Sequence, residues 1–241
     1  MKYYFLTIIL NLFLIGASAQ KTITFNSKDS LTVTADLYQA GTNSPYMVLF
    51  HQANYSRGEY KESAPKLNKL GYNCLAVDLR SGNEVNYIKN NTALLAREKN
   101  MPVESLSAIA DMKAAIDYAY QKSNKPVVVF GSSYSASLCL VLAKNNPKIK
   151  AVIAFSPGEY FDTKLNVRDS IAGLNIPVFV AVSEIEVSYM KELFSKVDHR
   201  NVTIFKPKND AGVQGSKALW ENNPSHNDYW LAIMQFIEEI K

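Results

Sequence analysis

The chain has 241 residues, of which 47% are hydrophobic and 20% are charged, and its formal net charge is +4. This apolar fraction excludes a disordered chain, and so small and dispersed a charge does not suggest a nucleic-acid-binding protein. Two cysteines exclude a disulfide-dense scaffold and a four-cysteine zinc site. Only three histidines are present, so any histidine-dependent chemistry must use His51, His199 or His226.

Residues 1–19 have the pattern of a secretory signal peptide. Lys2 precedes an apolar run over residues 3–15, and Ala17-Ser18-Ala19 supplies the small residues of a cleavage site. The run is shorter than the ~20 residues of a bilayer span, and an uncleaved membrane anchor is the alternative. We therefore expect an exported protein, periplasmic or secreted, with no stable membrane span after cleavage and one domain over residues 20–241.

Two kinds of strand pattern follow the leader. Residues 22–25 and 31–38 alternate apolar and polar side chains, as half-buried strands do, and the polar residues between them predict a hairpin. Later runs are apolar throughout, which is typical of strands buried on both faces of a parallel sheet. These runs cover residues 46–50, 73–77, 126–130, 149–155, 177–182 and 201–205.

Helical patterns separate these strands. Helices are predicted over residues 57–70, 103–121, 134–144, 187–197 and 226–240, the first with a capping box formed by Ser56 and Glu59. Alternation of strands and helices predicts the α/β class: a mostly parallel central sheet with an N-terminal antiparallel hairpin and helices on both faces. The connections over residues 81–102 and 156–176 are long, and each is a candidate for a small lid.

The most informative segment is a serine-rich turn. An apolar strand runs into Gly131-Ser132-Ser133-Tyr134-Ser135, and an apolar helix follows. A G-x-S-x-S sequence between strand and helix is typical of a nucleophile elbow, with Ser135 where a second glycine is usual. The sharp turn would present the Ser133 hydroxyl at the carboxyl end of the sheet and aim the Tyr134 N–H at a developing oxyanion. A serine-rich turn without chemistry is the alternative.

At this turn the chain resembles the α/β-hydrolase family in its small, dienelactone-hydrolase-like form, and the resemblance covers essentially the whole chain after the leader. Phe50-His51-Gln52-Ala53 stands where the family has its oxyanion-hole loop, which implies a second oxyanion donor at the N–H of Gln52 or Ala53. The segment Asp78-Leu79-Arg80-Ser81-Gly82 resembles the one that follows the family's next strand. His51 is then expected to shape its loop by hydrogen bonding and not to act as the base.

The family orders its triad as serine, acid and histidine, which places the acid just after the strand at residues 177–182. Glu184 and Glu186 both follow that strand. Distance from the strand favours Glu186, which would hold and polarise a base histidine, and Glu184 is the alternative. Either could instead be a solvated residue at the start of the next helix, where the helix dipole favours negative charge.

The base belongs in the loop after the last strand, where the family has a glycine-flanked His-Gly and this chain has Gln214-Gly215. Glutamine can hydrogen-bond a serine hydroxyl, but it accepts no proton near neutral pH. His199 precedes the last strand, so we expect it at the opposite end of the sheet. His226 follows the correct strand and is the remaining candidate, unless it is only an exposed residue at the start of the last helix.

Two functions from different classes follow. In the first, the protein is an exported serine hydrolase of ester or other acyl substrates, with Ser133 as nucleophile, Glu186 as orienting acid and His226 as base. In the second, the protein keeps the hydrolase fold but is catalytically impaired by Gln214 at the base position, and it binds a small ligand or a protein partner.

Other chemistries lack their motifs. The sequence has no phosphate loop, no G-x-G-x-x-G and no metal-spaced Cys/His cluster, so we expect no metal and no cofactor. The expected partner is a small acyl substrate or ligand and not a nucleic acid, and the oligomeric state is left open. Cys74 and Cys139 lie in apolar runs and are expected as buried thiols, with a bridge between them as the alternative.

Overall fold

A computed structural model describes residues 20–241. The predicted signal peptide at residues 1–19 lies outside the described residues. Eight strands form one sheet in the order β1-β2-β4-β3-β7-β8-β9-β10. They are β1 (Gln20–Asn26), β2 (Thr32–Tyr38), β3 (Tyr46–Phe50), β4 (Asn73–Val77), β7 (Val127–Ser132), β8 (Ile149–Phe155), β9 (Val178–Ala181) and β10 (Val202–Phe205).

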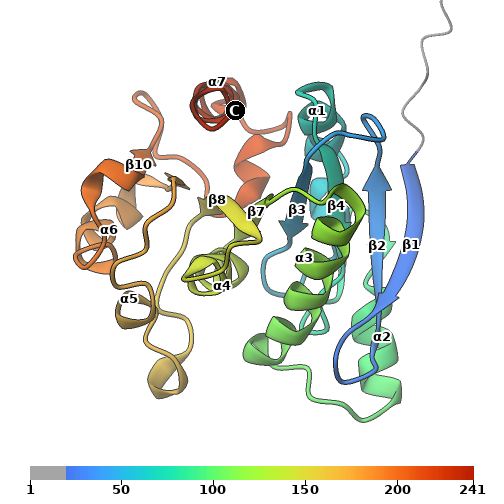
Figure 1. Ribbon diagram of the computed structural model, residues 1–241. Helices are drawn as coiled ribbons and strands as arrows, with labels where there is room; N and C mark the ends of the chain where they lie inside the picture. Colours follow the sequence, from blue (N-terminus) through green and yellow to red (C-terminus); the bar gives the residue numbers. More distant parts are fainter. Residues whose placement is uncertain (1–19) are drawn as a thin grey trace, which may run out of the picture.

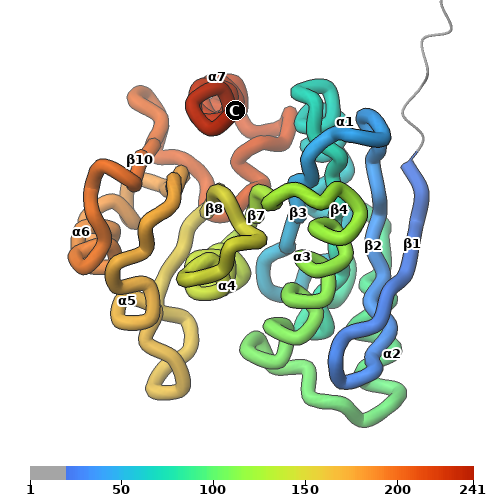
Figure 2. The backbone as a smooth tube through the Cα atoms, in the orientation of Figure 1, coloured from blue at the N-terminus to red at the C-terminus, as the bar shows by residue number. Residues whose placement is uncertain are grey.

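The sheet has the predicted mixture of directions. β1 and β2 pair antiparallel, β2 joins β4 antiparallel, and all other pairs in this sheet are parallel. Figure 2 shows the β1–β2 hairpin at one edge of the molecule and β10 near the other. The side chains of β3, β4 and β7 are buried along their whole length, which explains why these strands read as continuous apolar runs.

Helices cover both faces of the sheet and enclose two apolar clusters, with α3 and α4 on one face and α1 and α7 on the other (Figure 1). The helices are α1 (Ser63–Lys69), α2 (Asn91–Glu98), α3 (Ile109–Ser123), α4 (Tyr134–Ala143), α5 (Val167–Ser170), α6 (Val187–Leu193) and α7 (His226–Glu239). The α4 helix is buried on nearly every side, because it packs between the sheet and its neighbours. The α/β fold class is therefore confirmed.

One predicted helix is divided. Residues 57–70 form a short 3-10 helix, η1 (Arg57–Tyr60), followed by α1. Pro65 lacks the N–H that a continuous helix would need at that position, so the longer helix is interrupted. The predicted capping box is also wrong: Ser56 accepts from the Gly58 N–H, whereas the Glu59 side chain points into the protein and accepts the Gln52 N–H.

The two long connections contain local structure of their own. Residues 81–102 hold a small hairpin, β5 (Glu84–Val85) with β6 (Ile88–Lys89), and then α2. Residues 156–176 hold the 3-10 helix η3 (Asp162–Lys164) and then α5. The second connection begins at the carboxyl end of β8, so it starts at the same sheet edge as the serine-rich turn after β7.

The two cysteines lie on opposite faces of the sheet. Cys74, on β4, belongs to the cluster under α1 and α7, and Cys139, on α4, belongs to the other cluster. Both thiols are free and fully buried. Burial raises the pKa of each thiol, which keeps both in the neutral, unreactive form.

Within residues 20–241, no helix has the length and apolar character that a membrane crossing requires.

Candidate active site

Ser133 lies in a strained turn between β7 and α4. Its backbone angles are φ 57° and ψ −126°, a region that a residue with a side chain seldom adopts. Gly131 is required before it, because a Cβ there would lie 2.5 Å from the backbone of Ala136. The Ser135 hydroxyl accepts from the Ser132 N–H at 2.9 Å and donates to the Phe50 carbonyl at 2.8 Å. Strand, glycine and serine hydroxyl together hold the turn in this geometry.

The loop after β3 places backbone amides at the same sheet edge. Phe50 pairs with Gly131 in the parallel register, so the residues that follow each strand emerge together. The Gln52 N–H already donates to the Glu59 carboxylate at 2.7 Å, which removes Gln52 as an oxyanion donor. Among the residues that the structure describes, the amides of Ala53 and Tyr134 have no protein acceptor. These two N–H groups are the remaining candidate oxyanion donors.

His51 fixes the loop after β3 through hydrogen bonds of its ring. It is fully buried, its Nδ1 bonds the Gln52 carbonyl at 2.8 Å, and its Nε2 accepts the Leu79 N–H at 2.9 Å. The carbonyl can only accept, so the proton is on Nδ1. Burial lowers the pKa of His51 to about 4, so the ring is neutral at physiological pH. Both ring nitrogens are engaged in loop geometry and neither is directed to Ser133.

Glu186 lies in the 3-10 helix η4 (Glu184–Glu186), just after β9. Its carboxylate accepts the Ser183 N–H at 2.8 Å, the Ser183 hydroxyl at 2.7 Å and the Ser156 hydroxyl at 3.0 Å. Glu184, by contrast, is exposed and forms an ion pair with Lys206 at 3.8 Å. Of the two predicted acids, only Glu186 bonds residues at the carboxyl edge of β8 and β9, and these bonds all go to its Oε2.

Gln214 and Ser133 share one neighbour, the hydroxyl of Tyr160. Tyr160 stands in the connection after β8, and its hydroxyl donates to the Ser156 carbonyl at 2.8 Å. Burial raises the pKa of Tyr160, and hydrogen-bonding interactions with the side chains of Ser133 and Gln214 partly offset that rise. The side chains of Gln214, in the loop after β10, and of Ser133 therefore both lie near the Tyr160 hydroxyl.

Ser156 links Glu186 to the loop that carries Gln214. Its backbone adopts φ 52°, and its hydroxyl donates to Glu186 while accepting the Gly215 N–H at 2.9 Å. Two hydrogen bonds therefore connect the acid to the residue that follows Gln214. Tyr160 and Ser156 were not identified from the sequence, although Ser156 follows a parallel strand directly, as Ser133 also does.

The two other histidines lie apart from this arrangement. His199 precedes β10, at the amino end of the parallel strands, and its side chain is 96% exposed. His226 begins α7, half-buried, with Nδ1 bonded to the Asn223 carbonyl at 2.8 Å. Within the described part of the chain, no hydrogen bond joins His226 to Ser133 or Glu186.

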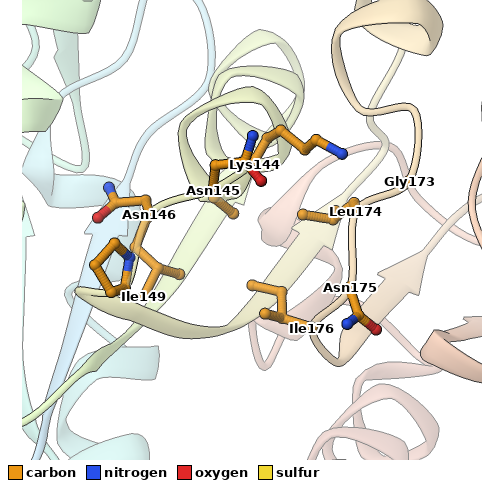
Figure 3. A pocket seen from close by; sticks show the side chains of 10 residues that line it. Lys144, Asn145, Asn146, Ile149, Gly173, Leu174, Asn175 and Ile176 are labelled. Atoms are coloured by element: carbon orange, nitrogen blue, oxygen red, sulfur yellow. The ribbon is translucent and has the colours of Figure 1, made fainter.

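A separate hollow lies away from the serine. It has a volume of about 340 Å³ and lies between the end of α4, the start of β8 and the segment before β9, with Lys144, Asn146 and Asn175 among its lining residues (Figure 3). These are the amino ends of parallel strands, so the hollow is at the sheet edge opposite Ser133. No triad residue contributes to it. No group of three or more metal-ligating side chains occurs among residues 20–241.

The strand order and the strained serine turn after β7 define the class of this protein, that of the α/β-hydrolase fold. The model of the dienelactone hydrolase family matches residues 34–204, and the chain belongs to that family. This match ends before Gln214, so family membership does not depend on the residue at the base position.

Solved structures share the fold at low sequence identity. An esterase of Pyrococcus furiosus is 16% identical with a TM-score of 0.67, over 92% of this chain and 93% of the esterase. A dienelactone hydrolase of Anabaena variabilis is 14% identical with a TM-score of 0.65, over 91% of this chain and 95% of that one. The α/β hydrolase GrgF of a Penicillium species is 12% identical with a TM-score of 0.68, over 92% and 99%. No curated protein sequence matches the chain.

Proposed function

We propose that this protein hydrolyses ester-like acyl substrates through Ser133, and that it does so slowly because Gln214 stands in place of the base. The observation that carries the proposal is the strained Ser133 turn facing two unoccupied backbone amides, those of Ala53 and Tyr134. Backbone strain of this kind costs about 1–3 kcal/mol and persists where the surroundings enforce it, commonly at functional sites.

In the proposed reaction the Ser133 Oγ attacks the carbonyl carbon of the substrate. The carbonyl oxygen becomes an oxyanion and receives hydrogen bonds from the N–H groups of Ala53 and Tyr134. The hydroxyl proton passes to solvent, because neither the Gln214 amide nor the neutral Tyr160 phenol is a base near neutral pH. The alcohol then leaves and the acyl-enzyme is hydrolysed by water, again without a base to activate that water.

This scheme predicts that the acyl-enzyme accumulates. Mixing the protein with p-nitrophenyl acetate should release a burst of about one equivalent of nitrophenol, followed by slow turnover. A fluorophosphonate probe should label Ser133, as located by peptide mass spectrometry, and Ser133→Ala should abolish both signals. Ser188→Ala, at an exposed serine of α6, is the matched control and should leave both unchanged. Equal labelling of Ser133→Ala and the native protein would contradict the proposal.

A binding function is the second candidate, and Gln214, where the family pattern has histidine, favours it. Ser183 and Ser156 both bond the Oε2 of Glu186, and no histidine among the described residues bonds this carboxylate. A fold with an oxyanion site but no base can still hold an acyl or carboxylate ligand at the sheet edge. Saturable binding of a non-hydrolysable phosphonate ester, with no covalent labelling of Ser133, would favour this second function.

We also propose that the protein is exported, which rests on the pattern of residues 1–19 alone. Expressed with its leader in a bacterium that has a Sec pathway, the protein should be recovered outside the cytoplasm with Gln20 as its first residue. Intact mass and N-terminal sequencing measure this directly. A product that retains Met1 and stays in the membrane fraction would instead identify an uncleaved anchor.

A further inference from the structure

Glu59 is a buried carboxylate that the proposed reaction does not use. It lies in η1 with no exposed surface, and no ion pair among the described residues includes it. A buried carboxylate without a cation is costly, so its oxygens must be satisfied by hydrogen bonds. Such a group is uncommon as a purely structural element, because a neutral side chain would avoid the cost of desolvating a charge.

Two hydrogen-bond donors and one further serine, from three different segments, surround the Glu59 carboxylate. The Gln52 N–H donates to Oε2 at 2.7 Å and the Ser216 hydroxyl donates to Oε1 at 2.6 Å. The Ser132 side chain is the third hydrogen-bonding neighbour, and the Ser132 hydroxyl also accepts the Ser216 N–H at 2.9 Å. Each of these residues is next to, or two residues from, a residue of the site.

The three segments that surround Glu59 are the oxyanion loop, the Ser133 turn and the segment after Gln214, and acyl transfer depends on their relative positions. Gln52 precedes Ala53, the candidate oxyanion donor, and Ser132 precedes Ser133. Ser216 follows Gln214 by two residues and begins the 3-10 helix η6 (Ser216–Leu219). The side chain of Trp220 further anchors this segment, because its indole N–H donates to the Glu59 carbonyl at 2.9 Å.

We propose that Glu59 is a positioning residue for acyl transfer, which holds the oxyanion loop, the Ser133 turn and the segment after Gln214 in register. The inference rests on the proposed function, since it assigns Glu59 to the same site. Glu59 touches no reacting atom, so its effect passes through the backbone of Ala53, through Ser133 and through residue 214. Ionised Glu59 can accept from all three neighbours, whereas a protonated carboxyl must turn one contact into a donor and break the pattern.

The charge of Glu59 changes near neutral pH. Burial raises its pKa to about 7, while hydrogen bonds from Ser216 and Gln52 and the charge of Lys217 oppose that rise. The other titratable groups that face it are Tyr60 and Tyr134, whose pKa values burial raises, and His51 lies one residue before Gln52 with a pKa near 4. These three stay neutral between pH 5 and pH 9, so Glu59 is the group of this cluster that titrates there.

The first test compares Ser133 phosphonylation rates across pH in the native protein and in Glu59→Gln. The native rate should show an extra rise of about tenfold between pH 6 and pH 8 as Glu59 ionises, and Glu59→Gln should lack this step and react more slowly at pH 8. Glu98→Gln, at an exposed carboxylate in α2, is the matched control and should follow the native profile. Parallel profiles for Glu59→Gln and the native protein would overturn the inference.

A second measurement does not depend on activity. Hydrogen–deuterium exchange in Glu59→Gln should accelerate about tenfold or more in peptides covering residues 51–54 and 214–218 together, with β1 and β2 unchanged. If Glu59→Gln does not fold, Ser216→Ala removes a single donor and should accelerate the same two segments to a smaller extent. Faster exchange in neither segment, or in only one, would overturn the positioning role. If the probe does not label Ser133 in the native protein, the proposed hydrolysis is wrong, but the exchange measurement still tests the positioning role of Glu59.

Discussion

Replacing Gln214 with histidine is expected to raise the rate of ester hydrolysis by about 10²–10⁴-fold, the usual contribution of a general base. The side chain at this position interacts with Tyr160, which also interacts with Ser133. An imidazole there would accept the Ser133 proton during acylation and activate water during deacylation. The gain should therefore appear both in the burst rate and in the steady-state rate with p-nitrophenyl acetate.

Two controls separate this explanation from others. Gln214→Asn keeps an amide at the position and should give no gain. His226→Ala should leave the native rate unchanged, because Nδ1 of His226 is bonded to the Asn223 carbonyl and no bond leads from it to Ser133 among the described residues. A native rate that His226→Ala abolishes would show that His226 reaches the serine in solution, and the explanation based on Gln214 would then be wrong.

The acid should matter only once a base is present. In the native chain Glu186 accepts from Ser183 and Ser156, so Glu186→Gln should change the slow native rate little. In the Gln214→His background the imidazole needs an orienting carboxylate, and Glu186→Gln should then remove most of the gain. Equal effects of Glu186→Gln in both backgrounds would indicate that the carboxylate serves the stability of η4 and not catalysis.

The sheet could be predicted from the sequence because each strand and turn is marked by residues that are close together in the chain. Each central strand is a short apolar run, and the Ser133 turn is readable because Gly131 and a helix-forming sequence flank it. The hairpin of β1 and β2 follows from the alternation of apolar and polar side chains, although β2 is not half-buried as predicted, because Thr34 and Asp36 on its polar face are buried too. These features depend on neighbours in the chain, so no knowledge of distant contacts is needed.

The supporting residues of the site could not be found in this way, because their roles depend on contacts across the chain. Glu59 fits a capping box by spacing, yet its partner Ser216 is 157 residues away. Tyr160 is one aromatic residue in a long connection, and nothing local marks it as the neighbour of both Ser133 and Gln214. The sequence also left Gln52 and Ala53 as alternative oxyanion donors. The structure leaves only Ala53 of these two, because the Gln52 N–H donates to Glu59.

Removing the Arg80 side chain should be among the most destabilising single changes in the molecule. Arg80 is 2% exposed and binds Asp111, which has no exposed surface, with guanidinium bonds of 2.7 to 3.1 Å. It also reaches Asp29 in the β1–β2 turn at 2.6 Å. Arg80→Ala would leave the Asp111 carboxylate buried without its cation, and breaking a buried pair in this way costs about 3–5 kcal/mol.

Urea unfolding at pH 7 measures this loss, and Arg200→Ala is the comparison. Arg200 pairs with Asp198 on the surface, where solvent screening makes the contribution of an ion pair to stability small. A double variant, Arg80→Ala with Asp111→Ala, should recover part of the stability, because no charge is then left buried and unpaired. A loss in Arg80→Ala no larger than that in Arg200→Ala would show that water reaches Asp111.

The stability gap between native protein and Arg80→Ala should narrow as the pH falls. Arg80 holds the pKa of Asp29 well below its usual range, so this stabilisation is present above the ordinary aspartate pKa and is lost as the pH falls through the folded-state value. In Arg80→Ala, acid would also neutralise the unpaired Asp111, whose pKa burial already raises in the native protein.

The Arg80 ion pair also supports the loop that carries Ala53, because Leu79, next to Arg80, donates its N–H to His51. Partial unfolding around Arg80 should therefore reduce Ser133 labelling before the sheet itself unfolds.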